Sequence, residues 1–176
     1  MPEPAFALRR LSPDDVPAIA DLYARCRDYF LLEGGAPPTV DDAHVLFTDI
    51  PESKQAVDQA VFGWGQGGRL DAVAAVLSDY PVVGEWYLGV LLVDPARRGQ
   101  GVGRTIYGMV EAWAVARGAR HMRVAVLEAN TAAHGFWRSL GFADLRTVAA
   151  ERFGRKWHRR VELRRDLVGY ASGTRV

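Results

Sequence analysis

A glycine-rich turn between an apolar run and a helical segment constrains this chain more than any other feature. The turn, residues 97–104, reads RRGQGVGR and follows the apolar run 86–93, which we expect to be a buried strand. Residues 101–117 then repeat apolar side chains at helical spacing. Glycines let a backbone approach an anion closely, and the amides at a helix start attract phosphate. With its three arginines, the turn predicts a ligand that carries several phosphates.

The spacing of the glycines excludes two common phosphate-binding motifs. A dinucleotide-binding fold requires G-x-G-x-x-G directly after the strand, whereas the glycines here are Gly99, Gly101 and Gly103. A Walker A loop requires G-x-x-x-x-G-K-[ST], and this turn holds no lysine. The pattern that remains is R-x-x-G-x-G, which begins at Arg98 and follows an Asp-Pro pair.

Composition favours a globular protein and does not indicate a nucleic-acid or membrane partner. The 176 residues, 49% hydrophobic and 24% charged, predict one domain over residues 1–176. The formal net charge of +1, and the acidic residues interleaved with the basic run 152–160, argue against nucleic-acid binding. The sequence has no apolar stretch long enough to span a bilayer and no secretion signal, so we expect a cytoplasmic protein with no membrane partner. Cys26 is the only cysteine, which excludes an intramolecular disulfide.

The order of apolar runs and turn signals predicts an α/β domain. Ser12 and Thr39 each begin a capping pattern ahead of helical spacing, and glycines end the two later helices. In the last strand, Trp157, Val161 and Leu163 are expected to face the core. We predict helices over 12–30, 39–48, 101–117 and 130–140, and strands over 6–11, 60–64, 70–77, 86–93, 122–127 and 157–163.

Two blocks of sequence together resemble the GNAT family of N-acetyltransferases. The first is LLVDPARRGQGVG, residues 91–103, and the second is N-x-x-A-x-x-F-W, residues 130–137, closed by Gly141 and Phe142. Neither block is specific alone, but in this order, with a strand between them, they form a strong signature. The resemblance covers about residues 5–168. It implies an α/β fold whose mixed, mostly antiparallel central sheet has about seven strands, about four flanking helices and a splayed central strand pair.

The resemblance implies acetyl-CoA as the cofactor, and no metal. In the family, loop amides hold the pyrophosphate, the preceding strand pairs with the pantetheine arm, and the second block contacts the arm from the other side. Transferred to this chain, the pyrophosphate-binding residues are Arg98, Gly99, Gln100, Gly101, Val102, Gly103 and Arg104, and the residues along the arm are Leu91, Leu92, Val93, Asn130, Phe136 and Trp137. Asn130 also suits a helix N-cap, and the two aromatic side chains also suit core packing.

The side chains that act as acid and base in many family members are missing. A tyrosine that protonates the leaving thiolate is replaced by Trp137, whose indole is far too weak an acid, and a strand glutamate is replaced by Gly89. Candidate catalytic replacements are Glu85, Tyr87, Tyr80 and His134. We expect Glu85 to act as a base through water, and a histidine such as His134 can serve as acid or base. The alternative for His134 is an ordinary exposed position on a helix.

These features predict an N-acetyltransferase that moves an acetyl group from acetyl-CoA to a primary amine of a small molecule or a protein by direct attack. The backbone of residues 91–93 can donate an N–H to the thioester oxygen. We expect the acceptor near Tyr29, Phe30, Glu33, Tyr80, Glu85, Trp86 and Tyr87. The missing acid and base leave a catalytically impaired acyl-CoA sensor or regulator as the alternative, and the sequence leaves open whether the chain forms a homodimer.

Overall fold

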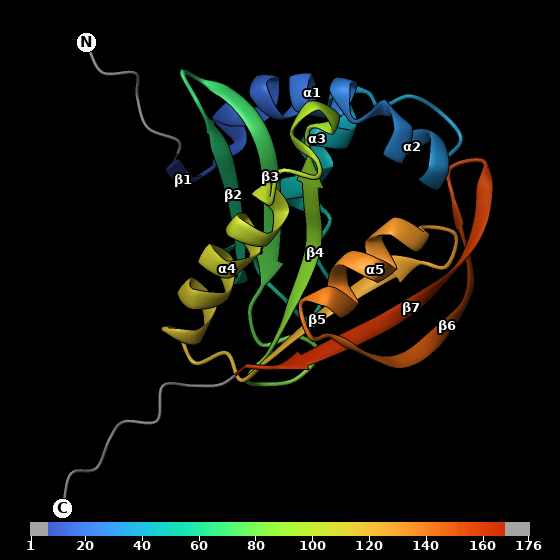
Figure 1. Cartoon of the computed structure of the whole chain (residues 1–176). Helices are drawn as coiled ribbons and strands as arrows, with labels where there is room; N and C mark the ends of the chain where they lie inside the picture. The colour runs from blue at the N-terminus through green and yellow to red at the C-terminus, as the bar shows by residue number, and fades with distance from the viewer. Residues whose placement is uncertain (1–6, 168–176) are drawn as a thin grey trace, which may run out of the picture.

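The structure, a computed structural model, describes residues 7–167 and has a seven-stranded sheet at its centre (Figure 1). Neighbouring strands follow the order β1-β2-β3-β4-β5-β7-β6 and are antiparallel, except for the parallel pair β4–β5. The strands are β1 (Ala7–Arg10), β2 (Gln59–Gln66), β3 (Arg69–Leu77), β4 (Glu85–Val93), β5 (His121–Leu127), β6 (Ala143–Phe153) and β7 (Lys156–Asp166). The α-helices are α1 (Val16–Arg25), α2 (Arg27–Glu33), α3 (Val40–Thr48), α4 (Val102–Val115) and α5 (Thr131–Ser139). The predicted mixed α/β sheet is confirmed.

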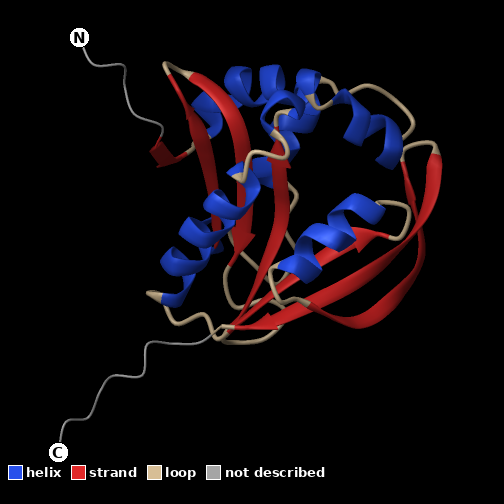
Figure 2. Cartoon of the chain, viewed as in Figure 1, coloured by secondary structure: helices blue, strands red, loops and turns tan. Residues whose placement is uncertain are grey.

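Helices cover both faces of the sheet (Figure 2). The helices α1 and α3 pack against one face of β2 and β3 in a core that includes Ile19 and Val73. The helices α4 and α5 pack against the opposite face in a second core that includes Ile106, Val124 and Trp137. Successive β3 side chains alternate between the two cores, as the two-residue period of a strand requires. None of the helices within residues 7–167 is long and apolar enough to cross a membrane.

The first predicted helix is divided into three parts. Ser12 forms the expected capping box with Asp15, but residues 13–15 make a 3₁₀ helix, and the α-helix that follows is interrupted at Cys26. Cys26 is fully buried and its ψ of 26° is outside the helical range. The interruption gives five α-helices instead of the four predicted, and α2 takes a separate direction toward the β6–β7 turn.

The prediction was wrong about the end of the sheet. Strand β6 was missed because nearly all of its residues are exposed and no apolar alternation marks it. Val161 and Leu163 face the core as expected, but Trp157 is 68% exposed. Strand β5 ends opposite Arg160, so the hairpin tip that carries Trp157 extends past the rest of the sheet. At the other end, the predicted first strand begins at Ala7, and Phe6 lies outside the described residues.

Candidate active site

The parallel strands β4 and β5 pair at only three positions and then diverge (Figure 1). The last pair is Tyr87 with Arg123. Pairing of β4 with β3 is shifted at the same level, because Ala75 lies opposite Val90 and the next residue of β3 lies opposite Leu88. Gly89 is the extra residue of this bulge, and a bulge bends its strand. The predicted splayed pair is confirmed, and the carboxyl half of β4, residues 88–93, has no strand partner on its β5 side.

The glycine turn brings the start of α4 next to this unpaired edge. Gly101 is the N-cap of α4 with a φ of +80°, and it provides no side-chain cap. The amide of Thr105 is the first to reach back into the helix, 3.0 Å from the Gly101 carbonyl. The preceding amides, Val102 to Arg104, therefore have no acceptor within the helix. A Cβ added at Gly99 or Gly101 would meet no atom within 4 Å, so this side of the turn is open and suits a pyrophosphate.

Asp94 anchors the turn to the body of the protein. Its carboxylate is only 2% exposed and accepts a hydrogen bond from the Ala96 amide at 2.9 Å. It also pairs with Arg25 of α1 and, at 2.8 Å, with Arg69 of β3. Burial alone would raise the pKa of Asp94, but the Ala96 amide and these two guanidinium groups hold that pKa below its usual range. The Asp-Pro pair of the sequence motif is thus a structural support for the turn.

The arginine side chains of the turn have protein partners. Arg97 lies 3.5 Å from an Asp71 carboxylate oxygen, and Arg98 forms a double ion pair with Asp28 of α2. The guanidinium of Arg104 donates to the Ser139 hydroxyl at 3.0 Å. Gln100 donates to the Ala96 carbonyl within the turn. Each of these side chains thus has a protein partner, and the backbone amides at the start of α4 are the donors that the helix itself leaves available.

The second sequence block packs against the turn through Phe136. A Cβ at Gly103 would lie 3.3 Å from the Phe136 ring, so glycine allows this close approach between α4 and α5. Trp137 is buried and meets Phe136, Tyr107 and Phe142 edge-on. Phe136 is half-buried beside the turn, whereas Trp137 belongs to the core.

Asn130 caps α5, because its Oδ1 accepts from the Ala133 amide at 3.2 Å. Within residues 7–167 its side-chain nitrogen donates to no protein group, which leaves that nitrogen available for a ligand.

Glu85 begins β4 and is ion-paired. Its carboxylate, 4% exposed, accepts from Arg123 Nε at 2.8 Å. Arg123 also pairs with Glu162 at 3.0 Å, and Arg146 pairs with the same carboxylate at 2.6 Å. The hydrogen bond from Arg146 is the main reason that the pKa of Glu162 is below its usual range. This network lies on the sheet face opposite α4 and α5, and sequence reasoning did not detect its arginine and Glu162 members.

Tyr87 lies where the two strands separate. Its ring atoms are 3.8 Å from the position that a Cβ of Gly89 would occupy, and its ring meets Tyr80 edge-on at 5.8 Å. Burial raises the pKa of Tyr87 above its usual value, against the opposing charge of Arg160. Trp86 was expected near the acceptor but faces the other way, into the core beneath α4, as alternation along the strand requires.

His134 is buried rather than exposed. Its Nε2 lies 3.1 Å from the Leu127 carbonyl, and its Nδ1 has no hydrogen-bond partner within residues 7–167. Phe136 of the same helix contacts α4 instead. The alternative of an ordinary exposed histidine is therefore wrong, because the side chain is buried against the end of β5.

The end of α2 contacts the hairpin of β6 and β7. The Gly34 carbonyl accepts from the Arg155 amide at 2.9 Å, and the His158 ring lies 2.9 Å from the Glu33 carbonyl. Within α2, the Tyr29 hydroxyl donates to the Glu33 carboxylate at 2.8 Å. Burial raises the pKa of Glu33 above its usual range, against the lowering effect of that hydrogen bond. The structure thus brings predicted acceptor residues of α2 together with a strand far away in the sequence.

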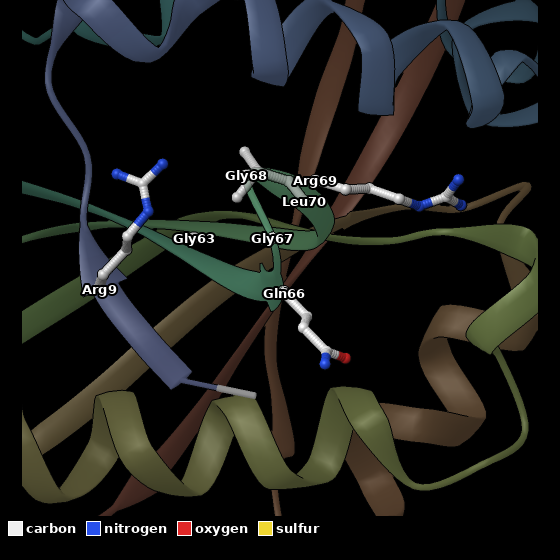
Figure 3. A pocket seen from close by; sticks show the side chains of 8 residues that line it. Arg9, Gly63, Gln66, Gly67, Gly68, Arg69 and Leu70 are labelled. Carbon is white, nitrogen blue, oxygen red and sulfur yellow. The ribbon is translucent and has the colours of Figure 1, made fainter. Parts of the chain in front are cut away.

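A shallow pocket at the β2–β3 turn is separate from this site (Figure 3). The side chains of its two arginines, Arg9 and Arg69, point in different directions in Figure 3. Arg9 pairs with Asp15 at 2.7 Å, and Arg69 pairs with Asp71 and Asp94. Because both charges are neutralised by the protein, this pocket offers little to a charged ligand.

The split parallel strand pair beside an uncapped, glycine-rich helix start is the arrangement that the sequence resemblance implied. The sequence model of the acetyltransferase (GNAT) family matches residues 17–142, and the chain belongs to this family. No curated protein matches the sequence.

Solved structures with this fold span nearly the whole chain. An acetyltransferase from Thermus thermophilus is 22% identical with a TM-score of 0.73, covering 95% of this chain and 100% of that one. The ribosomal-protein-S18-alanine N-acetyltransferase from Escherichia coli is 19% identical with a TM-score of 0.70, covering 98% and 100%. A GCN5-related N-acetyltransferase from Kribbella flavida is 24% identical with a TM-score of 0.68, covering 93% and 98%. At these identities, the likeness establishes the fold.

Proposed function

We propose that this protein is an acetyl-CoA-dependent N-acetyltransferase that acetylates a primary amine of a small molecule or a protein by direct attack. The observation that carries the proposal is the position of the unpaired β4 edge, residues 88–93, next to the uncapped start of α4. The strand edge provides backbone groups for an extended amide-containing chain, and the helix start provides N–H donors for a pyrophosphate. Acetyl-CoA carries both chemical groups, and when bound it supplies an activated acetyl thioester.

We assign the cofactor-binding residues as follows. The amides of residues 99–104 hold the pyrophosphate, since the Arg98 amide already donates to the Pro95 carbonyl at 3.3 Å. The backbone of residues 91–93 pairs with the pantetheine arm. The free nitrogen of Asn130 and the ring of Phe136 contact that arm from α5. We assign Trp137 to the core, because its ring is buried among Phe136, Tyr107 and Phe142.

Tyr87 is our candidate for the proton donor. Its ring occupies the neighbourhood of Gly89, where the sequence lacks the family glutamate, and burial favours the protonated phenol at neutral pH. Glu85 remains our candidate for the base, acting through water, although its ion pair with Arg123 also gives it a structural role. His134 is the weakest candidate, since its side chain is buried and its Nε2 already lies 3.1 Å from the Leu127 carbonyl.

Direct attack agrees with the state of the single cysteine. Burial raises the pKa of Cys26 to about 11, and its Sγ donates to the Val93 carbonyl. At this pKa, Cys26 has little thiolate at neutral pH. Because the thiolate is the nucleophilic form of a cysteine, Cys26 is a poor nucleophile. The amine itself is therefore the expected nucleophile toward the thioester carbonyl.

The first experiment measures melting temperature with and without acetyl-CoA and then thiol release with an amine panel. The panel contains polyamines, amino acids and peptides with an N-terminal alanine, the residue named for the Escherichia coli structure. Binding at about 100 times the Kd must add about 2.7 kcal/mol to the free energy of unfolding. Absence of any thermal shift overturns the proposal, and a shift with no turnover of any amine supports the acyl-CoA sensor instead.

The second experiment tests the assigned proton-transfer residues on the best amine. We expect Tyr87→Phe to lower kcat with little change in the KM of acetyl-CoA, because only the hydroxyl is lost. Glu85→Gln keeps the shape of the side chain and removes its charge. Unchanged kcat/KM in Glu85→Gln excludes it as the base, and unchanged kcat in Tyr87→Phe excludes it as the acid.

A further inference from the structure

A second open hollow lies at the opposite end of α4 from the glycine turn. Its cavity volume is about 320 Å³, within the size range of small-molecule sites. The residues that line it are Arg10, Val57, Asp58, Gln59, Ser78, Asp79, Trp86, Trp113 and Arg117. A helix of 14 residues is about 21 Å long, so this hollow is distinct from the proposed pyrophosphate site.

Two guanidinium groups in the hollow lie over one tryptophan. The Arg117 guanidinium carbon is 4.2 Å from the centre of the Trp113 ring, and that of Arg10 is 5.5 Å from it. The two positive charges are close enough to affect each other, because burial and then the charge of Arg117 lower the pKa of Arg10. Each side chain also donates to one backbone carbonyl, Arg10 to Gln59 at 2.8 Å and Arg117 to Trp113 at 3.1 Å.

No carboxylate of residues 7–167 forms an ion pair with either arginine. The two aspartates that line the hollow are engaged elsewhere. Asp58 accepts from the Gln55 amide at 2.8 Å and lies 3.5 Å from the Lys54 ammonium, and Asp79 accepts from the Gly84 amide at 2.6 Å. Stacking on an aromatic ring stabilises one cation, but it does not relieve the repulsion between two. An anion between the two guanidinium groups would relieve it.

The lining of the hollow is mostly polar, but three of its residues, Val57, Trp86 and Trp113, form an apolar part of the wall. Trp113 packs edge-on against Trp86 and Phe62, and Val57 at the rim is 82% exposed. An aromatic or aliphatic group bound here would cover exposed apolar surface next to the charges. We propose that this hollow binds a small organic anion, with its carboxylate or phosphate group between Arg10 and Arg117 and its apolar group against Trp113.

Calorimetric titration of the full chain tests this site with three probes that share a phenyl ring. Benzoate and phenyl phosphate carry the anion, and benzyl alcohol carries only the ring. We expect the two anions to bind and the alcohol to bind at least tenfold more weakly, with a change in the Trp113 indole N–H signal by NMR. Comparing the two anions identifies whether carboxylate or phosphate is preferred. No binding of either anion at millimolar concentration overturns the proposal.

Variants then locate the bound anion. Arg10→Gln and Arg117→Gln are each expected to weaken benzoate binding about tenfold or more, since each removes a charge-assisted contact. Arg159→Gln removes an exposed charge from the distant β7 strand and is expected to leave binding unchanged. Binding must also persist with saturating acetyl-CoA. Competition by acetyl-CoA, or wild-type affinity in both Arg10→Gln and Arg117→Gln with an unchanged melting temperature, contradicts the proposal.

Discussion

Replacing Asp94 tests the idea that a buried carboxylate fixes the cofactor turn. Asp94→Ala removes the acceptor of the Ala96 amide and leaves Arg25 without its buried partner. Loss of one member of a buried ion pair costs roughly 3–5 kcal/mol. Arg25 keeps its hydrogen bonds to Asp21 and to the Leu70 carbonyl, so we expect the lower end of that range, about 3 kcal/mol. For a chain of this size, such a loss lowers the melting temperature by roughly 6–12 °C.

The assay combines chemical denaturation with steady-state kinetics. Asp94→Asn is the matched control, because it retains a side-chain oxygen for the Ala96 amide and removes only the charge. We expect the KM of acetyl-CoA to rise more in Asp94→Ala than in Asp94→Asn, while the KM of the amine stays unchanged. Equal rises in both KM values would mean that Asp94 supports the whole fold rather than the turn.

The pH dependence of stability provides the result that would refute the reasoning. Because the pKa of Asp94 is lower in the folded protein than in the unfolded chain, its contribution is present above the unfolded value, about 3.9. That contribution is lost as the pH falls through the folded pKa. The difference in unfolding free energy between the native protein and Asp94→Asn must therefore shrink at acid pH. An equal difference at about pH 7 and about pH 3 refutes the ion-pair argument.

Further substitutions test other supports of the site. Gly101→Ala forces an L residue to a φ of +80°, which should lower the free energy of unfolding by about 1 kcal/mol and weaken acetyl-CoA binding. Gly108→Ala, inside α4, should instead raise the free energy of unfolding by about 0.5–1 kcal/mol. Thermal melts and acetyl-CoA titrations compare the two. Gly103→Val should push Phe136 away from α4, which isothermal titration would detect as weaker acetyl-CoA binding with a normal amine KM. Arg123→Met leaves the buried Glu85 carboxylate unpaired and takes one of two arginine partners from Glu162, which keeps Arg146. It should lower the unfolding free energy by about 3 kcal/mol in urea titration.

The donor half of the site could be predicted from sequence because its residues are nearly contiguous. A strand, a glycine turn and a helix start within residues 86–104 fix the open edge and the amides relative to one another. Side-chain partners could not be predicted in this way. Arg98 pairs with Asp28, seventy positions away, and nothing local distinguishes such an arginine from one that faces a phosphate. The same holds for His134, whose burial and contact with the Leu127 carbonyl follow from tertiary packing.

The acceptor half of the site depends on contacts that no local pattern encodes. The break at Cys26 directs α2 toward the β6–β7 turn, where Gly34 meets Arg155 and Glu33 meets His158. The apolar periodicity of residues 16–30 continues across the break, because Cys26 itself is a core residue, so the pattern predicted one long helix. The hairpin that receives α2 has almost no buried side of its own. Both elements take their positions from each other, so the proposed acceptor region forms only when residues 27–34 meet residues 154–158.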